Sequence, residues 1–344
     1  MTAPTPATRP SRSSGAPPRD PTHRGTPRGS PGPPRPDPSA RTAPLPYGPP
    51  YLIGDPAAAR RDLTELRRAL AGAGVVAEAA VARPVERAGA IAARALERGH
   101  RLLVAVGSDL VAHGVLRALG GPTGPRWPEA VLGLAGLGRQ DLAATFGLPE
   151  DPQRLARHLL GDQLFLADIG RARWRGSDGA ERVGVFANCA ELGYPAEVST
   201  RVPGAARAGR VGRLAAALGG LRVSRSTPAR LELDHAAVEL RLAGLVVANG
   251  QFTMGRMKVA PRALPDDGRM SVIAFQGEPL GIYARSKNLY YGDHVPHPTI
   301  REYQSRRVLV DTAEPLTLAL DGWRAAGGPP VTVEALEGVL RVKV

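Results

Sequence analysis

The stretch LLVAVGSDLVAHGVLRAL, residues Leu102 to Leu119, decides the fold that we expect for this chain. Its first five residues are apolar and predict a short buried strand, which Gly107-Ser108-Asp109 end. Apolar residues spaced four apart then predict a helix. A strand that leads through a small-residue turn into a helix is typical of phosphate binding. Small residues let backbone N–H groups approach the anion, and the helix N-terminus adds partial positive charge.

Asp109 leaves two interpretations of this turn open. Its carboxylate would repel a bare phosphate, so the first interpretation places a metal ion between the two. The second is an ordinary strand-to-helix turn in which Asp109 is the N-cap of the helix.

Composition and charge favour a cytoplasmic protein with an anionic partner. The 344 residues can form two domains, and the single cysteine, Cys189, excludes a disulfide within the chain. No apolar run approaches the roughly 20 residues that span a bilayer. The net charge of +13 favours a phosphate, an acidic lipid surface or nucleic acid. Basic and aromatic residues are not interleaved on one element, which disfavours nucleic acid.

Three regions differ in their sequence patterns. Residues 1–46 are rich in Pro, Arg, Ser, Thr and Gly, and we expect a disordered tail. In residues 47–162 strands alternate with helices, which predicts a doubly wound α/β nucleotide-binding domain. The expected strands are 51–53, 75–81, 102–106 and 130–135, and the expected helices are 57–71, 84–98 and 140–146.

Residues 163–344 predict a β-rich domain, a sandwich or barrel, with one clear helix near 207–218. The expected strands are 163–173, 183–187, 229–233, 238–248, 270–275, 307–310, 316–320 and 339–344.

One stretch of this β-rich region resembles a known family. Residues 245–275, LVVANGQFTMGRMKVAPRALPDDGRMSVIAF, are similar to the β-domain signature of the diacylglycerol kinase catalytic family, which includes bacterial lipid kinases and sphingosine kinases. The residues that carry the similarity are Asn249, Gly255, Ala260-Pro261, Ala263 and Asp267-Gly268. Other matching segments follow the family's order: Asn188, Leu192-Gly193, Gly292-Asp293-His294, His297-Pro298 and Asp321-Gly322. Together they cover residues 51–344.

The resemblance also identifies two loops of the α/β region. Residues 107–111 take the place of the family's Gly-Gly-Asp-Gly-Thr phosphate loop, with Gly107 and Asp109 kept. Residues 135–143, AGLGRQDLA, resemble the second nucleotide loop, in which Gln140 and Asp141 match an Asn-Asp pair. A one-residue shift of that alignment would instead restore its glycines. The departures from the family are Leu110 for Gly, Val111 for Thr, Gly114 for Glu, and Trp323 for the Glu of Asp-Gly-Glu.

The family resemblance implies a role for each matched residue. Gly107, Ser108 and Asp109 would bind the phosphates of ATP, with Asp109 linked to Mg²⁺. Asp321 would act as general base on a lipid hydroxyl, so Asp109 and Asp321 are the expected catalytic residues. The remaining nucleotide-pocket residues would be Gly138, Gln140 and Asp141. Asp267 would belong to an acidic turn that can hold a structural Mg²⁺, unless it forms a plain Asp-Gly β-turn.

The implied activity is ATP- and Mg²⁺-dependent phosphorylation of a hydroxyl group on diacylglycerol or a related lipid. One alternative is a catalytically impaired member of the family that binds nucleotide or lipid without turnover. Another is an NAD kinase, which shares the Gly-Gly-Asp loop. The expected partners are a membrane lipid substrate and the anionic inner face of the membrane, without nucleic acid. The sequence leaves a homodimer open.

Overall fold

The computed structural model describes residues 45–344, apart from 59, 122–123 and 206–208. The predicted tail lies outside the described residues except for its last two positions. Residues 43–344 form one compact unit. No helix within the described ranges is both long and apolar enough to cross a membrane.

Four parallel strands form the α/β part in the order β2, β1, β3, β6. They are β1 (Tyr51–Gly54), β2 (Glu78–Val81), β3 (Leu102–Val106) and β6 (Val131–Ala135). Every residue of β1, β3 and β6 is buried, as expected for parallel strands that are covered on both faces.

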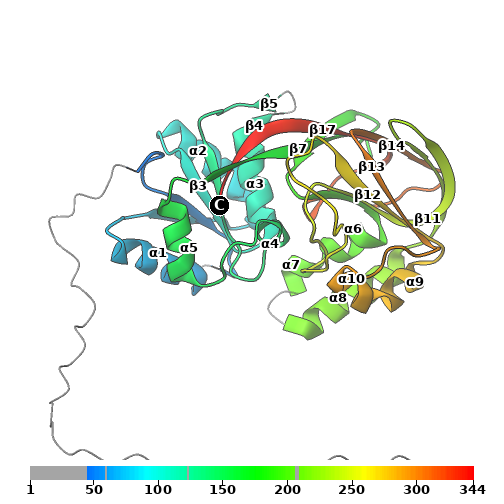
Figure 1. The fold of residues 1–344 in the computed structure, drawn as a ribbon, viewed down its shortest axis with the longest axis horizontal. Helices are drawn as coiled ribbons and strands as arrows, with labels where there is room; N and C mark the ends of the chain where they lie inside the picture. The colour runs from blue at the N-terminus through cyan, green and yellow to red at the C-terminus, as the bar shows by residue number, and fades with distance from the viewer. Residues whose placement is uncertain (1–44, 59, 122–123, 206–208) are drawn as a thin grey trace, which may run out of the picture. The chain divides into compact units, whose positions relative to one another are not determined.

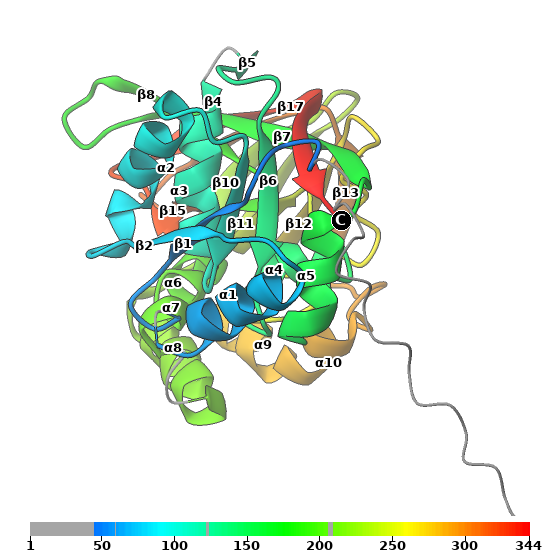
Figure 2. The same cartoon turned by 90° about the vertical axis from the view of Figure 1, so that its left-hand side faces the viewer.

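Helices cover both faces of these strands (Figure 2). On one face lie α1 (Asp62–Gly72) and α5 (Pro152–Leu160), whose leucines pack into a shared apolar cluster. On the other face lie α2 (Ala88–Glu97), which follows the 3₁₀ turn η1 (Val85–Arg87), and α3 (Asp109–Leu119). This arrangement confirms the predicted doubly wound fold. Helix α1 begins at residue 62 rather than 57, because the Asp55 side chain accepts the Ala58 N–H and holds the preceding residues in a turn.

A single long strand, β17 (Gly328–Lys343), connects the α/β part to the β-rich part (Figure 1). Near Val342 it pairs in parallel with β6. Along its length it pairs antiparallel with β7 (Leu164–Arg175), and nearer its start with β14 (Arg307–Thr312). The two parts therefore share one continuous sheet of 15 strands.

The remaining strands of this sheet pair antiparallel and enclose a second core. That core contains the fully buried side chains of Phe186, Leu245 and Val331. These strands are β8 (Glu181–Phe186), β9 (Cys189–Gly193), β10 (Thr227–Glu232), β11 (Ala237–Ala248), β12 (Met270–Gln276), β13 (Ile300–Ser305), β15 (Leu318–Leu320) and β16 (Trp323–Arg324). A separate small hairpin joins β4 (Gly120–Gly121) to β5 (Gly124–Pro125).

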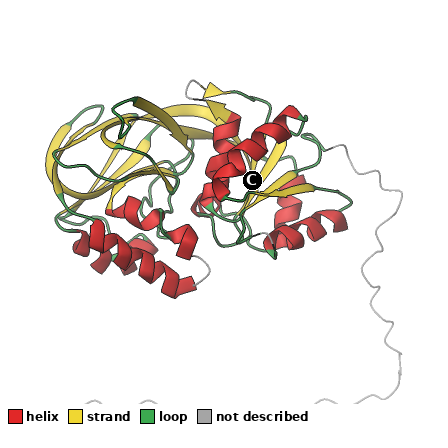
Figure 3. Ribbon diagram, turned by 180° about the vertical axis from the view of Figure 1, so that it is seen from behind, coloured by secondary structure: helices red, strands yellow, loops and turns green. Residues whose placement is uncertain are grey.

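Helices gather on one side of the β-rich part (Figure 3). They are α6 (Tyr194–Ser199), α7 (Val202–Ala205), α8 (Gly209–Val223), α9 (Pro279–Ala284) and α10 (Ser286–Tyr291). Ile282 and Leu289 pack with Val246 and Phe275 of the strands in a further apolar cluster. One more helix, α4 (Asp141–Thr145), follows β6 in the α/β part.

Helices α2 and α3 approach each other closely at two glycines. A Cβ atom at Gly114 would lie 2.7 Å from Ala88 Cβ and 3.0 Å from the Gly89 backbone N. Position 114, where the family resemblance places a glutamate, therefore has no room for a side chain in this structure.

We expect Gly114→Ala to lower the free energy of unfolding by about 1–3 kcal/mol, because the added methyl group must displace packed backbone. The higher helix propensity of alanine, about 1 kcal/mol, offsets part of this loss. Urea unfolding followed by circular dichroism measures the change. The control is Gly72→Ala in α1, where a Cβ would meet nothing within 4 Å. Equal stability changes in the two variants would contradict the packing explanation.

Candidate active site

Asp321 lies in a tight turn that carries its side chain to the centre of the site. Leu320 pairs with Trp323, so Asp321-Gly322 is the two-residue loop of the β15–β16 hairpin. Both residues have positive φ, 49° and 78°, which is the requirement of a type I′ turn. Asp-Gly is among the few dipeptides that adopt this turn readily, so the sequence itself positions the carboxylate.

The carboxylate of Asp321 is buried and hydrogen-bonded on both oxygens. The backbone N–H groups of Asn188 and Cys189 donate to Oδ1 at 2.8 and 3.0 Å. The Ala187 N–H donates to Oδ2 at 3.0 Å, and His113 Nδ1 lies 3.2 Å from the same oxygen. Asp321 thus joins the turn to the start of β9 and to α3, the helix that follows the predicted phosphate loop.

Asp55, which directly follows β1, holds the predicted phosphate loop in place. Gly107 has φ of 115°, and a Cβ there would lie 2.6 Å from Asp55 Oδ2. Only glycine fits this position. Asp55 Oδ2 accepts the Ser108 N–H at 2.9 Å, and Oδ1 accepts the Ala58 N–H at 2.7 Å. Asp55 therefore shapes the loop on which phosphate binding would depend.

Asp109 and Asp141 each bind the backbone of the next loop. Asp109 accepts the N–H groups of Asp141 and Leu142 at 2.9 and 3.1 Å, which caps the N-terminus of α4. Asp141 in turn accepts the N–H groups of Gly255 and Arg256 at 3.0 and 2.6 Å. The two aspartates form a chain of contacts from the phosphate loop to the β-rich part.

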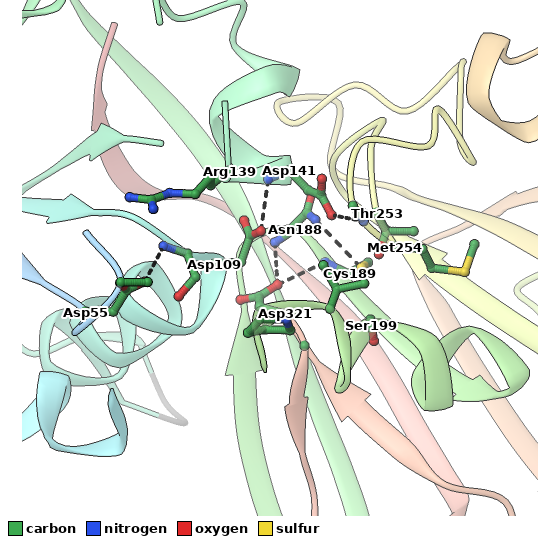
Figure 4. Close-up of a pocket in the computed structure, with 16 residues that line it drawn as sticks. Asp55, Asp109, Arg139, Asp141, Asn188, Cys189, Ser199, Thr253, Met254 and Asp321 are labelled. Atoms are coloured by element: carbon green, nitrogen blue, oxygen red, sulfur yellow. Dashed lines mark hydrogen bonds between the residues drawn. The ribbon is translucent and has the colours of Figure 1, made fainter. Parts of the chain in front are cut away.

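Four of the predicted site residues line one pocket (Figure 4). They are Ser108, Asp109, Asp141 and Asp321. Gly107, Gly138 and Gln140 do not line it. The Gln140 side chain lies under the loop, where its Nε2 donates to Ala105 O at 3.0 Å. Other lining residues were not predicted as site residues: Asp55, Arg139, Ser199, Val202, Thr253 and Met254. Of these, only Asp55 had a local signal, since it follows a buried strand at the same sheet edge.

The asparagines of the family signature fasten loops to one another. Asn249 Nδ2 donates to the carbonyl oxygens of Asp168 and Ala187 at 2.8 and 2.9 Å. Asn188 Nδ2 donates to Phe252 O at 2.9 Å. These bonds keep the loop that carries Asn188 in the position from which its backbone reaches Asp321.

The metal assignments of Asp109 and Asp267 remain predictions. Asp267 is exposed, does not line the pocket, and accepts the Arg269 N–H at 3.0 Å within its Asp-Gly turn. Among the described residues there is no group of three or more His, Cys, Asp or Glu side chains that could hold a metal ion. A Mg²⁺ ion at the pocket would therefore depend on nucleotide phosphates together with one or two carboxylates, which is its usual environment in kinases.

Burial shifts several pKa values of the site upward. Burial, and then the neighbouring Asp141 carboxylate, raise the pKa of Asp109 well above its usual range. Burial also raises the pKa of Asp141, against the hydrogen bonds from Gly255 and Arg256. Glu191 of β9 is hydrogen-bonded to Ser199 and Thr253, yet burial raises its pKa to about 8. The site therefore concentrates acidic groups that are costly to ionise together.

Comparison with known proteins shows a similarity to lipid kinases. Residues 188–344 match the family described as the YegS C-terminal NAD kinase beta sandwich-like domain. The "probable lipid kinase YegS" of Salmonella paratyphi A is 26% identical over 224 residues, which are 62% of this chain and 68% of the relative. The corresponding protein of Salmonella newport shows the same identity and coverage. The chain is thus similar to lipid kinases of the YegS type, and the match to the family model lies in its residues 188–344.

Solved structures show the same fold. A "putative diacylglycerol kinase" from Bacillus anthracis str. Sterne superposes with a TM-score of 0.65 at 19% identity, covering 86% of this chain and 96% of that one. A second diacylglycerol kinase structure from that organism gives a TM-score of 0.61 at 15% identity, with the same coverage. These similarities confirm the fold that the sequence predicted. The roles of the individual site residues stay predictions.

The raised pKa of Glu191 predicts how stability depends on pH. Its pKa is about 8 in the folded protein against 4.5 for the ordinary side chain, so the folded state keeps a proton that the unfolded state releases. The difference in the pKa of Glu191 contributes its full stabilisation of the folded state below pH 4.5. This contribution is lost as the pH rises toward 8.

We therefore expect Glu191→Gln, which cannot ionise, to become more stable relative to the native protein as pH rises from 5 to 8.5. The gain should be on the order of a few kcal/mol, because each pKa unit corresponds to about 1.4 kcal/mol. Urea unfolding at several pH values tests this. A constant stability difference across the range would show that Glu191 ionises normally.

Proposed function

We propose that this protein is a lipid kinase that transfers the γ-phosphoryl group of ATP to a hydroxyl group of diacylglycerol or a related lipid. The similarity to probable lipid kinases supports kinase chemistry on lipids. The observation that carries the proposal is the meeting of Asp321 with the phosphate-loop region: its carboxylate lies 3.2 Å from His113 of α3, and Asp321 and Ser108 line the same pocket.

The pocket offers the groups that phosphoryl transfer needs. Positioning and electrostatic stabilisation account for most of the catalysis in such enzymes. The backbone after Gly107 and the N-terminus of α3 would bind phosphate oxygens. A bound Mg²⁺ would neutralise charge on the phosphates, and Asp109 or Asp141 would be its protein ligand. Asp321 would orient the acceptor hydroxyl from the opposite wall.

Two observations favour the alternative of an impaired family member. First, the pocket is narrow, with a cavity of about 50 Å³, so a nucleotide could enter only if the surrounding loops move. Second, Asp109 and Asp141 already use both carboxylate oxygens to bind backbone N–H groups. Nucleotide or lipid binding without turnover would fit a site in which these contacts persist.

The variant Asp321→Asn distinguishes an active lipid kinase from an impaired family member. Asparagine keeps the type I′ turn but loses the carboxylate, so we expect phosphoryl transfer to fall at least 100-fold, the usual scale for loss of a general base. Labelled ATP, Mg²⁺ and mixed micelles of diacylglycerols or sphingoid bases measure the transfer, and NAD is included as an acceptor.

The matched control is Asp178→Asn, which alters an exposed Asp-Gly turn between β7 and β8 that lies outside the pocket. It should keep the native rate. If the native protein shows no transfer above the Asp321→Asn background, the impaired alternative is supported and calorimetry with ATP tests it. Phosphorylation of NAD alone would overturn the assignment to lipids.

A second proposal concerns the membrane surface. Helix α8 exposes Val211, Leu214 and Leu218, which are spaced as one helical face. Its sequence, GRVGRLAAALGGLRV, has no acidic residue, and Arg213 and Arg222 are exposed beside the apolar face. An apolar face flanked by arginines fits the interface of an anionic membrane. We propose that this face of α8 docks on anionic lipid.

This docking predicts a selective loss of vesicle binding. Replacing Val211 and Leu218 by aspartate should weaken binding to vesicles containing phosphatidylglycerol at least tenfold, because apolar burial and charge attraction are both reduced. Co-sedimentation measures the effect. Val76→Asp, at an exposed valine before β2, is the control and should bind as the native protein does. Equal binding of all three proteins would contradict the docking.

A further inference from the structure

A groove with a volume of about 530 Å³ runs along the solvent side of α2 and α3, the helix pair on the outside of the sheet (Figure 2). Its floor consists of small, half-buried residues of the two helices: Gly89, Ala93, Gly114 and Ala118. Short side chains leave a depression into which the side chains of another helix can pack. The helix pair therefore offers a packing surface on the side away from the sheet.

The two walls of the groove carry opposite charges. Glu86 of η1 and Glu97 of α2 form one wall. The other wall is formed by Arg117 of α3 and by Arg126, whose backbone N–H donates to Leu119 O at the end of that helix. All four charged side chains are exposed, and none of them makes an ion pair within the described residues. The groove thus presents an acidic wall and a basic wall that the described part of the chain does not neutralise.

The end of the basic wall is held in place by its neighbours. The backbone N–H groups of Arg126 and Trp127 both donate to Leu119 O, at 2.9 and 3.3 Å. The Trp127 ring also lines the groove, and the guanidinium carbon of Arg101 lies 5.2 Å from its centre. Arg101 is fixed in turn by an ion pair with Glu129 at 3.0 Å. A partner that binds here would therefore have little of this wall to order, which lowers the cost of association.

Two-fold symmetry makes these walls complementary to those of a second copy of the chain. A two-fold axis that runs along the groove lays α2 of each chain over α3 of the other. Each acidic wall then faces a basic wall, and this happens twice because both chains use the same surface. An axis across the groove would instead bring the two acidic walls together, which costs free energy. The charges therefore select one arrangement of two chains.

We propose that this protein forms a homodimer through the α2–α3 groove, and that Glu97 of each chain pairs with Arg126 of the other. Both helices connect parallel strands of one sheet, so they run in the same direction. Glu97 is the last residue of α2, and Arg126 is bonded to the last residue of α3. An axis along the groove keeps these two helix ends at the same level, so each Glu97 meets an Arg126. The dimer does not depend on the proposed kinase function.

Sedimentation velocity of the full chain, over a wide range of protein concentrations, tests this proposal. We expect the native protein to reach twice the mass of a single chain as its concentration rises. Glu97→Arg and Arg126→Glu should each weaken the dimer at least tenfold, because each places like charges opposite one another at two symmetry-related positions. A native protein that sediments only as a single chain at every concentration would overturn the proposal.

Mixing the two variants tests the pairing itself. In a heterodimer of Glu97→Arg with Arg126→Glu, both pairs again join opposite charges, so the mixture should form dimers within threefold of the native affinity. The double variant Glu97→Arg/Arg126→Glu should recover in the same way. The matched control is Arg68→Glu, an equal charge change at an exposed position of α1 that does not line the groove. It should dimerise as the native protein does, and it should not rescue Glu97→Arg on mixing.

The outcomes separate this surface from other ways of associating. A dimer that persists unchanged in both single variants would show that the chains associate elsewhere, and it would overturn the proposal. Dissociation that neither mixing nor the double variant reverses would overturn the pairing of Glu97 with Arg126. Unaltered thermal unfolding of each variant shows that dissociation is not misfolding. Because no measurement uses phosphoryl transfer, an inactive enzyme would leave the dimer standing.

Discussion

Four hydrogen bonds converge on the carboxylate of Asp321, and the arrangement of the site depends on them. They connect a hairpin turn, the start of β9 and helix α3, which are far apart in the sequence. A buried carboxylate is costly unless it is fully hydrogen-bonded, so this contact forms completely or not at all. Asp55, Asp109 and Asp141 bind backbone N–H groups in the same way. Each loop of the site is thus held by the side chain of another.

This construction explains which family features the chain keeps. Asn188 and Asn249 hold the loop that supports Asp321, so their loss would leave buried carbonyl oxygens without partners. The side chains of Leu110 and Val111 do not hold any loop of the site in this way. Val111 is buried in the core, and Leu110 lines a cavity together with His113 and Trp323. Gly114 permits the close approach of α2 and α3. These substitutions therefore fit the packing of the fold, whatever they change in the chemistry.

Local sequence patterns predicted the α/β elements well because buried parallel strands and amphipathic helices have strong periodic signals. The resemblance to the lipid kinase family led to the prediction of Asp109, Asp141 and Asp321 as site residues. The short helix α6 escaped prediction because six buried residues show no clear period. The pairing of His113 with Asp321 was also beyond the sequence. A lone histidine within an apolar helix face gives no sign of a partner that only tertiary folding brings near.

Strand β17 has a consequence for how the protein is made. The parallel strand β6 emerges from the ribosome long before Val342 is available to pair with it. Until then β6 presents an open edge, which is a template for wrong pairing with other chains. Such distant pairing also slows folding. The α/β part is the first to be synthesised but among the last to be completed. During that interval, synthesis rate and chaperone binding would govern the yield of correctly folded protein.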